Sequence, residues 1–442
     1  MVKKEDDIMT YFFAGIKGTG MSALASMLHD LGNDIIGYDD NSKYSFTEEE
    51  LVKRNIPIYY DLNNLKTDMI FVYTSAIHSD HKAVIKANEL GLKMYEYFEL
   101  LGEFTKNYET YCISGCHGKT TTTALLSKIF TDSKYGCNYL IGDGRGFIDK
   151  DSDIFIVESC EYKRHFLNYF PKYIVITNIE LDHIDYYKDL DDYISAFQEF
   201  IDKKCEKVIA CGDDLNVRKL KGNNITYYGL NDNNDIVAKN LVLDDKGSQF
   251  DCYINSTFFG HFDIPLYGKH MVLDALACIA LSNLKGITPK EIEASMCNFE
   301  GAKRRFKEEK IGNNILIDDY AHHPSEVKVT LLAAKQKYPD KELVAILKIH
   351  TLSRAKEMKD DFIDALNIAD KVYVMDIYND REDPNDYPGV DHNLIINGCK
   401  NAEYINEDMA DKLLCHTNSV ICFLSSKDIY FLMEKYKELL RR

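Results

Sequence analysis

The sequence predicts an α/β protein of three domains. Apolar runs of strand length alternate with helical stretches along the chain, and this pattern is typical of parallel sheets covered by helices. Glycine-rich turns separate a strand from a helix at residues 15–20 and 115–118. The length of 442 residues suits two to four domains, at about 100–200 residues each.

The first predicted domain, residues 1–107, is Rossmann-like. Its apolar runs alternate with amphipathic segments, so we expect a parallel sheet with helices on both faces. The expected strands cover 11–16, 33–40 and 69–75, and the expected helices cover 21–32, 45–55 and 81–91.

The second predicted domain, residues 108–306, is of the P-loop ATPase type, and the third, residues 307–442, is again Rossmann-like. The second has expected strands at 109–113, 153–159, 173–179 and 207–212, further strands between 224 and 265, and a helix at 269–284. The third has a strand from 315 and others at 342–349, 371–378 and 419–426, with helices between them.

Composition narrows the function classes. A net charge of −18 argues against a nucleic-acid partner and requires any nucleotide site to supply its own cations or a metal. The 12 cysteines form no C-x-x-C pair, which argues against a zinc ribbon and a disulfide framework. The charged N-terminus and the lack of an apolar run near about 18 residues predict a cytoplasmic protein with no membrane partner.

The strongest motif is the run Ser114–Thr121, SGCHGKTT, between a strand and a helix. A glycine turn at a helix N-terminus directs backbone N–H groups at an anion, and the helix dipole adds to the attraction. Lys119 can reach the outer phosphates of a nucleotide, and the hydroxyl of Thr120 or Thr121 can ligate Mg²⁺. The standard phosphate loop has glycine where Ile113 stands, so the local match is partial. The alternative is an ordinary strand–turn–helix.

Two further groups follow apolar strands of the same domain. Glu158 ends one strand, where an acid beside a phosphate loop can bind Mg²⁺. Asn178, Asp182 and His183 follow another strand, and ligands of α/β folds bind at the carboxyl ends of parallel strands. The alternative is that Glu158 is merely solvated and that His183 is a hydrogen-bonded loop residue.

The N-terminal loop Gly15-Ile16-Lys17-Gly18-Thr19-Gly20 is a weaker glycine motif. A dinucleotide fingerprint requires glycine at 15, 17 and 20, and Lys17 replaces the middle one. Asp39 stands where a ribose-binding acid is expected. We therefore expect a phosphate site to which Lys17 adds charge, rather than a nicotinamide site.

Two stretches near the second domain junction are dense in polar residues. One is the cationic run Gly301–Phe306, GAKRRF, and the other is Asp318–Pro324, DDYAHHP. A charge run is usually a solvated face, and paired histidines are usually structural, so neither stretch alone predicts a function.

Together these stretches resemble the Mur ligase family, and most of all its alanine-adding members. SGCHGKTTTT resembles the phosphate loop of the family, and TNIELDH, DDYAHHPSE and the HTLSR of residues 350–354 are similar to further motifs. GIKGTGMSALA resembles the glycine loop for the UDP-sugar. The matches run in order from about residue 12 to about residue 390.

The resemblance implies ATP-dependent joining of L-alanine to the carboxylate of UDP-N-acetylmuramate, an early step of peptidoglycan precursor synthesis. The carboxylate attacks the γ-phosphate of ATP to give an acyl phosphate, and the amine then expels phosphate. It implies an N-terminal domain for the UDP moiety, a central domain for ATP, and a C-terminal domain that closes on ATP and the amino acid.

The resemblance also assigns residues to roles. Catalysis is assigned to Lys119, Glu158, His183 and Arg354, and Mg²⁺ to Thr120, Glu158 and His183. The residues implied to bind ATP are Gly115, Cys116, His117, Gly118, Lys119, Thr120, Thr121, Asn178, His270, Asp274, Arg305 and Asp319. Those implied to bind the other substrates are Gly15, Lys17, Gly18, Thr19, Gly20, Met21, Asp39, Ser75, His322 and His323.

The chain departs from the family pattern at several positions. Met271 and Asp274 replace asparagines, Lys17 replaces a glycine, Lys348-Ile349 replaces Gln-Pro, and Cys116 replaces a threonine. A carboxylate cannot donate as an amide does. A thiol at a helix N-terminus beside a lysine is expected to be ionised and reactive; the alternative is that Cys116 fills a threonine-sized space and is inert.

Three other functions compete with the alanine ligase. One is a related ligase that attaches a recycled murein peptide to the same sugar nucleotide. Another is a nicotinamide dehydrogenase built on the first glycine loop, which the missing glycine at position 17 disfavours. The last is an ATPase switch, whose hydrolysis would not depend on a UDP-sugar.

Overall fold

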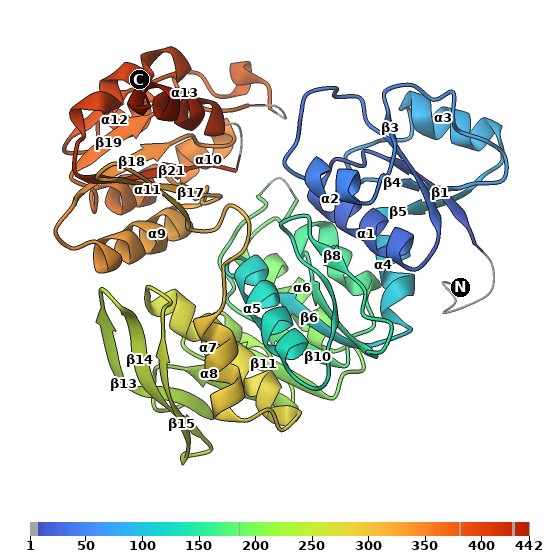
Figure 1. The fold of residues 1–442 in the computed structure, drawn as a ribbon, viewed down its shortest axis with the longest axis horizontal. Coiled ribbons are helices and arrows are strands. Elements are labelled where there is room, and N and C mark those ends of the chain that lie inside the picture. The colour runs from blue at the N-terminus through green and yellow to red at the C-terminus, as the bar shows by residue number, and fades with distance from the viewer. Residues whose placement is uncertain (1–7, 185, 380–381, 427–428, 442) are drawn as a thin grey trace. The chain divides into compact units, whose positions relative to one another are not determined.

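The chain forms three β-sheets with helices packed on them, one in each predicted domain (Figure 1). The computed structural model describes residues 8–184, 186–379, 382–426 and 429–441. Within these residues the chain divides into two compact units. The first unit runs to Lys239 and adds Asp251–Gly260 and Leu273–Phe299, and the second combines Asn240–Phe250, His261–Val272 and the chain from Glu300. No helix among the described residues has the length and apolar character needed to cross a bilayer.

The N-terminal sheet has five parallel strands in the order β3-β2-β1-β4-β5. Its elements are β1 (Thr10–Ala14), α1 (Thr19–Asp30), β2 (Asp34–Tyr38), α2 (Glu48–Lys53), β3 (Ile58–Tyr59), β4 (Ile70–Tyr73), α3 (Lys82–Glu89), β5 (Lys93–Glu96) and α4 (Tyr97–Thr105). Side chains alternate across a strand, so β1 feeds two cores. Tyr11 and Phe13 pack with α1 and α4, whereas Phe12 and Ala14 pack with α3.

The central sheet has ten strands in the order β15-β14-β13-β12-β11-β10-β6-β9-β7-β8. Its strands are β6 (Glu109–Ser114), β7 (Asn138–Leu140), β8 (Gly146–Phe147), β9 (Ile154–Glu158), β10 (Tyr173–Ile176), β11 (Lys207–Cys211), β12 (Ile225–Gly229), β13 (Ile236–Asp244), β14 (Gly247–Ile254) and β15 (Thr257–Ile264). Its helices are α5 (Lys119–Asp132), α6 (Leu190–Ile201), α7 (Lys269–Leu284) and α8 (Pro289–Cys297), with 3₁₀ turns η1 (Tyr162–Asn168) and η2 (Val217–Lys219). Strand β6 pairs in parallel with β9 and β10, so the ends of all three strands meet at one edge.

The C-terminal sheet has six strands in the order β16-β17-β21-β18-β19-β20, antiparallel only between β16 and β17. Its strands are β16 (Lys307–Ile311), β17 (Asn314–Asp319), β18 (Glu342–Leu347), β19 (Lys371–Val374), β20 (Ala402–Tyr404) and β21 (Ser419–Leu424). Its helices are α9 (Pro324–Lys337), α10 (Leu352–Glu357), α11 (Lys359–Leu366), α12 (Asn393–Ile396) and α13 (Tyr430–Leu440), with 3₁₀ turns η3 (Pro384–Asp386) and η4 (Glu407–Cys415). Helices α9 and α11 pack on one face of the sheet, and α13 packs on the other.

The predicted elements match these elements closely, and the three-domain α/β fold is confirmed. The sequence did not predict the strands β3, β5, β7, β8, β16 and β20 or the helices α4, α6 and α8. Strand β3 has two residues, and β5 and β16, KMYE and KEEKI, are rich in charge. Each pairs with a single neighbouring strand, so none carries the apolar run that identifies a central strand.

Candidate active site

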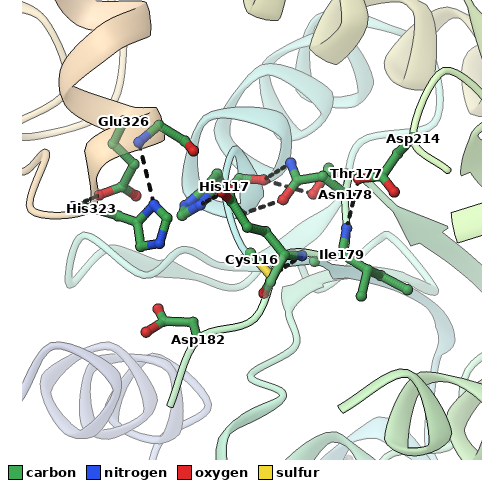
Figure 2. A network of polar contacts seen from close by, with 12 residues as sticks. Cys116, His117, Thr177, Asn178, Ile179, Asp182, Asp214, His323 and Glu326 are labelled. Atoms are coloured by element: carbon green, nitrogen blue, oxygen red, sulfur yellow. Dashed lines mark hydrogen bonds and ion pairs between the residues drawn. The ribbon is translucent and has the colours of Figure 1, made fainter. Parts of the chain in front are cut away.

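The loop between β6 and α5 is held by the segment that follows β10 (Figure 2). The backbone N–H of Cys116 donates to the carbonyl of Asn178 at 3.2 Å, and that of His117 donates to the Asn178 side chain at 2.9 Å. In return the Thr177 hydroxyl donates to the His117 carbonyl at 2.6 Å. The motifs at 114–121 and 177–183 therefore form one structure, as their places at the ends of paired strands predict.

Two glycines give this loop its shape. Gly115 and Gly118 have φ values of +133° and +82°, a region in which residues with a Cβ are strained. A Cβ at Gly115 would also lie 2.1 Å from the Thr177 hydroxyl oxygen. Gly118 is the N-cap of α5, whose first backbone N–H groups have no helical partner and suit an anion.

Lys119 is the first residue of α5 and is paired with the buried Glu161. Its ammonium lies 3.0 Å from the Glu161 carboxylate and also donates to the carbonyls of Gly115 and Cys116. Burial by itself lowers the pKa of Lys119, but the charge of Glu161 and smaller contributions from nearby groups, Glu158 among them, together outweigh burial and leave that pKa raised. Lys119 therefore stays charged beside the loop, and this charge supplies the local cation that a protein of net charge −18 needs at an anion site.

His183 lies on the other side of the same carboxylate. Its Nε2 is 3.4 Å from Glu161 Oε1. Burial lowers the pKa of His183, but the hydrogen bond to Glu161 and the charge of Asp182 leave it raised overall. His183 also has a φ of +54°. Such a value is uncommon for residues other than glycine, and residues that adopt it are often found at functional sites. Its ring contacts Tyr162, with centroids 4.7 Å apart.

The region around Lys119 also contains oxygen atoms of the kind that bind a small divalent cation. Glu158 adds a second carboxylate, which accepts from the Gly142 N–H at 2.9 Å and helps raise the pKa of Lys119. Thr120 adds a hydroxyl on the first turn of α5. Hydroxyl and carboxylate oxygens are the ligands that Mg²⁺ prefers. A bound Mg²⁺ would offset charge on nucleotide phosphates, with Thr120, Glu158 and His183 as its expected protein ligands.

Glu161 is the residue of this cluster that the sequence reading missed. It is 1% exposed and accepts from Lys119 while facing His183. The signal was present, because Glu161 follows Glu158 by three residues at the same strand end. Without the structure, nothing distinguished which of the two acids turns inward.

The expectation that Cys116 is a reactive thiolate is wrong. The Cys116 side chain is 8% exposed, and burial, followed by the charge of Glu161, raises its pKa well above the usual range. The sulfur lies 2.8 Å from the Glu180 carbonyl and 3.0 Å from the Tyr193 hydroxyl. Because burial outweighs the nearby lysine, the second expectation holds, and Cys116 is a neutral group that fills space.

His117 and Thr121 complete the loop region. His117 is partly buried, and its Nε2 lies 3.2 Å from the Glu180 carboxylate. Thr121 is the third residue of α5 and is also partly buried. Asp182 accepts from the N–H of His183 at 2.7 Å and so shapes the turn that carries the imidazole.

The N-terminal glycine loop follows β1, and α1 begins at Thr19. Lys17 turns away from this helix: its ammonium lies 2.9 Å from Glu48 and donates to the carbonyls of Asn41 and Lys43. Asp39 accepts from the N–H of Lys17 at 3.2 Å. In this structure Lys17 and Asp39 thus hold the segment 39–48 against the loop.

The other residues expected to bind the UDP moiety lie along the same edge. Gly15 precedes Lys17 in the loop, Gly18 is the N-cap of α1, and Gly20 and Met21 lie in its first turn. Ser75 follows β4, the neighbour of β1, and is partly buried.

The run 318–326 in the second unit organises the start of α9. Asp319 is 6% exposed and accepts from the N–H groups of Phe306 and Ala321, and burial raises its pKa to about 6. His323 and Glu326 form a reciprocal cap at the N-terminus of α9 (Figure 2). His322 Nδ1 lies 3.2 Å from Glu326. The two histidines therefore have structural contacts of their own.

The two arginines predicted for the site also lie in this unit. The Arg305 guanidinium is 4.9 Å from the centroid of the Tyr320 ring. Arg354 lies in α10, whose N-cap Thr351 has the unusual φ of +79°. Glu382, which the sequence reading missed, accepts from the N–H groups of Leu352 and Ser353 and so fixes the start of that helix.

Helix α7 carries the two residues expected near adenine. His270 is partly buried, and burial lowers its pKa to about 4. Asp274 is 5% exposed, and burial raises its pKa to about 7. A Cβ on Gly118 would lie 2.8 Å from Asp274 Oδ1, so Asp274 packs against the phosphate loop itself.

The fold and the loop define a multidomain α/β protein with a phosphate-loop type of site. Comparison with protein families is more specific. The Mur ligase family catalytic domain matches residues 10–109, the Mur ligase middle domain matches 113–282, and the Mur ligase glutamate ligase domain matches 304–418. These matches follow one another along most of the chain, and the chain belongs to the Mur ligase family.

Solved structures of several ligases share the whole fold. A UDP-N-acetylmuramate–alanine ligase from Thermotoga maritima is 24% identical, with a TM-score of 0.84 over 98% of this chain and 99% of that one. A murein peptide ligase from Psychrobacter arcticus is 22% identical, with a TM-score of 0.72 over 98% of each chain. A pseudomurein peptide ligase from Methanothermus fervidus is 17% identical, with a TM-score of 0.66 over 98% and 99%.

Proposed function

We propose that this protein joins L-alanine to the carboxylate of UDP-N-acetylmuramate at the expense of ATP. The observation that carries the proposal is the cluster at the start of α5, where Lys119 is held charged beside the phosphate loop by Glu161. The family match supports an acid–amino acid ligase. The likeness to the alanine ligase of Thermotoga maritima, over nearly the full length of both chains, supports the choice of substrates.

The proposed reaction needs positioning and charge rather than a covalent enzyme intermediate. The substrate carboxylate attacks the γ-phosphorus of ATP, ADP leaves, and an acyl phosphate forms. The alanine amine then attacks the acyl carbon, and phosphate leaves. Lys119 stabilises charge on the transferring phosphoryl group, and the N–H groups at the start of α5 bind the phosphates. Mg²⁺, held by Thr120, Glu158 and His183, would neutralise further phosphate charge.

Lys119 must change partners for this role. In the structure it donates to the Gly115 and Cys116 carbonyls of its own loop. A phosphate oxygen would replace these neutral acceptors, while Glu161 keeps the ammonium protonated.

We propose that the other domains supply the remaining contacts. From the C-terminal domain, Arg305 and Asp319 bind ATP and Arg354 takes part in catalysis. The N-terminal loop holds the UDP moiety.

The experiment is phosphate release with ATP and UDP-N-acetylmuramate against a panel of amino acids and peptides, with product masses measured. Alanine should give the highest kcat/KM. A preference for a tripeptide would instead support the second candidate, attachment of a recycled murein peptide, which the likeness to the Psychrobacter ligase favours. Phosphate release without a UDP-sugar would contradict both.

A further inference from the structure

Asp274 is a buried carboxylate that the proposed reaction does not use. It is 5% exposed, and its Oδ2 has no hydrogen-bond partner among the described residues. A buried polar atom without a partner costs free energy, and the cost is larger when the group is ionised. Such a group in a folded protein requires an explanation.

Asp274 lies beside the phosphate loop. Its Oδ1 would lie 2.8 Å from a Cβ on Gly118, the N-cap of α5. The same N-cap and the N–H groups beyond it form the anion site of the phosphate loop. An ionised Asp274 would place a negative charge beside the loop at which nucleotide phosphates are expected to bind.

No cation among the described residues is seen to pair with Asp274. The titratable groups that face it are the Cys278 thiol from its own helix and the Tyr228 phenol from β12, and burial keeps both neutral. From α5 it meets Thr122, whose hydroxyl offsets only part of the effect of burial. Lys119, the nearest cation of the loop, is paired with Glu161 instead.

We propose that Asp274 is the residue of the phosphate-loop site that takes up a proton when nucleotide binds, so that nucleotide affinity falls as pH rises. This inference rests on the proposed function, because it takes the loop 114–121 as the nucleotide site. The proton passes from solvent to the Asp274 carboxylate and removes its repulsion with the phosphates. Burial, offset in part by Thr122, already raises the pKa of Asp274 to about 7, so the change falls near neutral pH.

Binding of ADP, followed by calorimetry from pH 6 to pH 9, tests the proposal. For the wild-type protein the association constant should fall by up to about tenfold per pH unit above neutrality, because one proton is linked to binding. In Asp274→Asn the association constant should no longer fall in this way. Any change that remains comes from the ionisation of ADP itself and should be the same in both proteins. Asp191→Asn, which removes an exposed charge of the same unit, should behave as wild type.

The heat of binding at pH 7 gives a second readout. In buffers of different ionisation enthalpy, the wild-type protein should show uptake of a fraction of a proton in excess of Asp274→Asn. Equal uptake in the two proteins, or affinities that are lowered equally at every pH, would overturn the proton-linked role and leave the nucleotide site intact. Absence of ADP binding at every pH would overturn the nucleotide site together with this inference.

Folding stability offers a check that needs no ligand. The folded pKa of Asp274 lies above its unfolded value, so the folded state binds more protons between about pH 4 and 7 and loses stability as pH rises through this window. Asp274→Asn should therefore gain stability relative to wild type at pH 8 and not at pH 4, as urea midpoints would show. The opposite order at pH 8 would contradict an unpartnered carboxylate at this position.

Discussion

The chain contains two similar glycine loops, and the lysine of each loop contacts a different kind of partner. Gly15-Ile16-Lys17 and Gly115-Cys116-His117 both follow the first strand of a domain, and in both the second residue is buried. Lys17 precedes its helix and turns away to Glu48, whereas Lys119 is the first residue of its helix and stays at the loop. The lysine that precedes its helix thus holds a distant segment, and the lysine that begins its helix remains beside the loop.

The acids that pair with the two lysines also differ in burial. Glu161 is 2% exposed at its side chain and Glu48 is 16% exposed. Glu161 also faces His183, so its removal takes a counter-charge from two groups, and a buried charge left without its partner is costly. We therefore expect the loss of Glu161 to cost more unfolding free energy than the loss of Glu48.

The largest expected effect is that of Glu161→Gln. Removing the carboxylate takes the principal counter-charge from the Lys119 ammonium, and breaking a buried pair costs about 3–5 kcal/mol of unfolding free energy. Urea denaturation measures this cost. Glu48→Gln is the matched variant and should cost less; a larger cost for Glu48→Gln would reverse the comparison.

Lys119→Ala is expected to lower turnover at least about 100-fold, because it removes a positioned charge from the transferring phosphoryl group. The measurement is steady-state phosphate release at saturating substrates. Lys128→Ala, on the exposed side of the same helix, is the control and should retain wild-type turnover. Near-normal release from the Lys119 variant would remove the loop from the reaction.

Glu158→Ala and His183→Ala should each raise the Mg²⁺ concentration needed for half-maximal activity, by about tenfold or more if both side chains are ligands. Titration of activity with Mg²⁺ at constant ATP measures this shift. Glu109→Ala alters a carboxylate at the opposite end of the same sheet region, paired with Lys172, and should leave the requirement unchanged. Unchanged requirements in both site variants would assign Glu158 and His183 to structural roles.

Lys17→Met should reduce the unfolding free energy by about 2 kcal/mol, since Lys17 donates several hydrogen bonds from a buried position. Turnover at saturating UDP-sugar should hardly change, and the KM for the UDP-sugar should rise as the segment 39–48 loosens. A large fall in kcat with normal stability would show that Lys17 acts in the reaction after all.

The sequence predicted what depends on apolar pattern and on strand ends. The alternation of strands and helices located the three sheets, and the glycines located the loop before α5. It did not predict which way Lys17, Cys116 and Glu161 point, because a side chain's partner comes from an element distant in sequence: Glu48 for Lys17, Tyr193 for Cys116 and Lys119 for Glu161. Burial, which decided the ionisation of Cys116 against the helix dipole, is likewise a property of tertiary packing.

The smallest expected effect concerns Cys116, which occupies the place of Ile16 in the other loop. Ile16 is fully buried, and a thiol in an equivalent place behaves as a small apolar side chain. Since the thiolate is the reactive form and burial raises the pKa of Cys116, a thiol reagent at pH 7.5 should label it far more slowly than the exposed Cys297 and Cys415. Peptide mapping after timed labelling measures the three rates in one sample.

Cys116→Ser should keep turnover within a few-fold of wild type, because a hydroxyl can also donate a hydrogen bond to the Glu180 carbonyl. Labelling of Cys116 as fast as Cys297, with ADP absent, would show that the loop opens and exposes the thiol, and would end the likeness to the fully packed N-terminal loop.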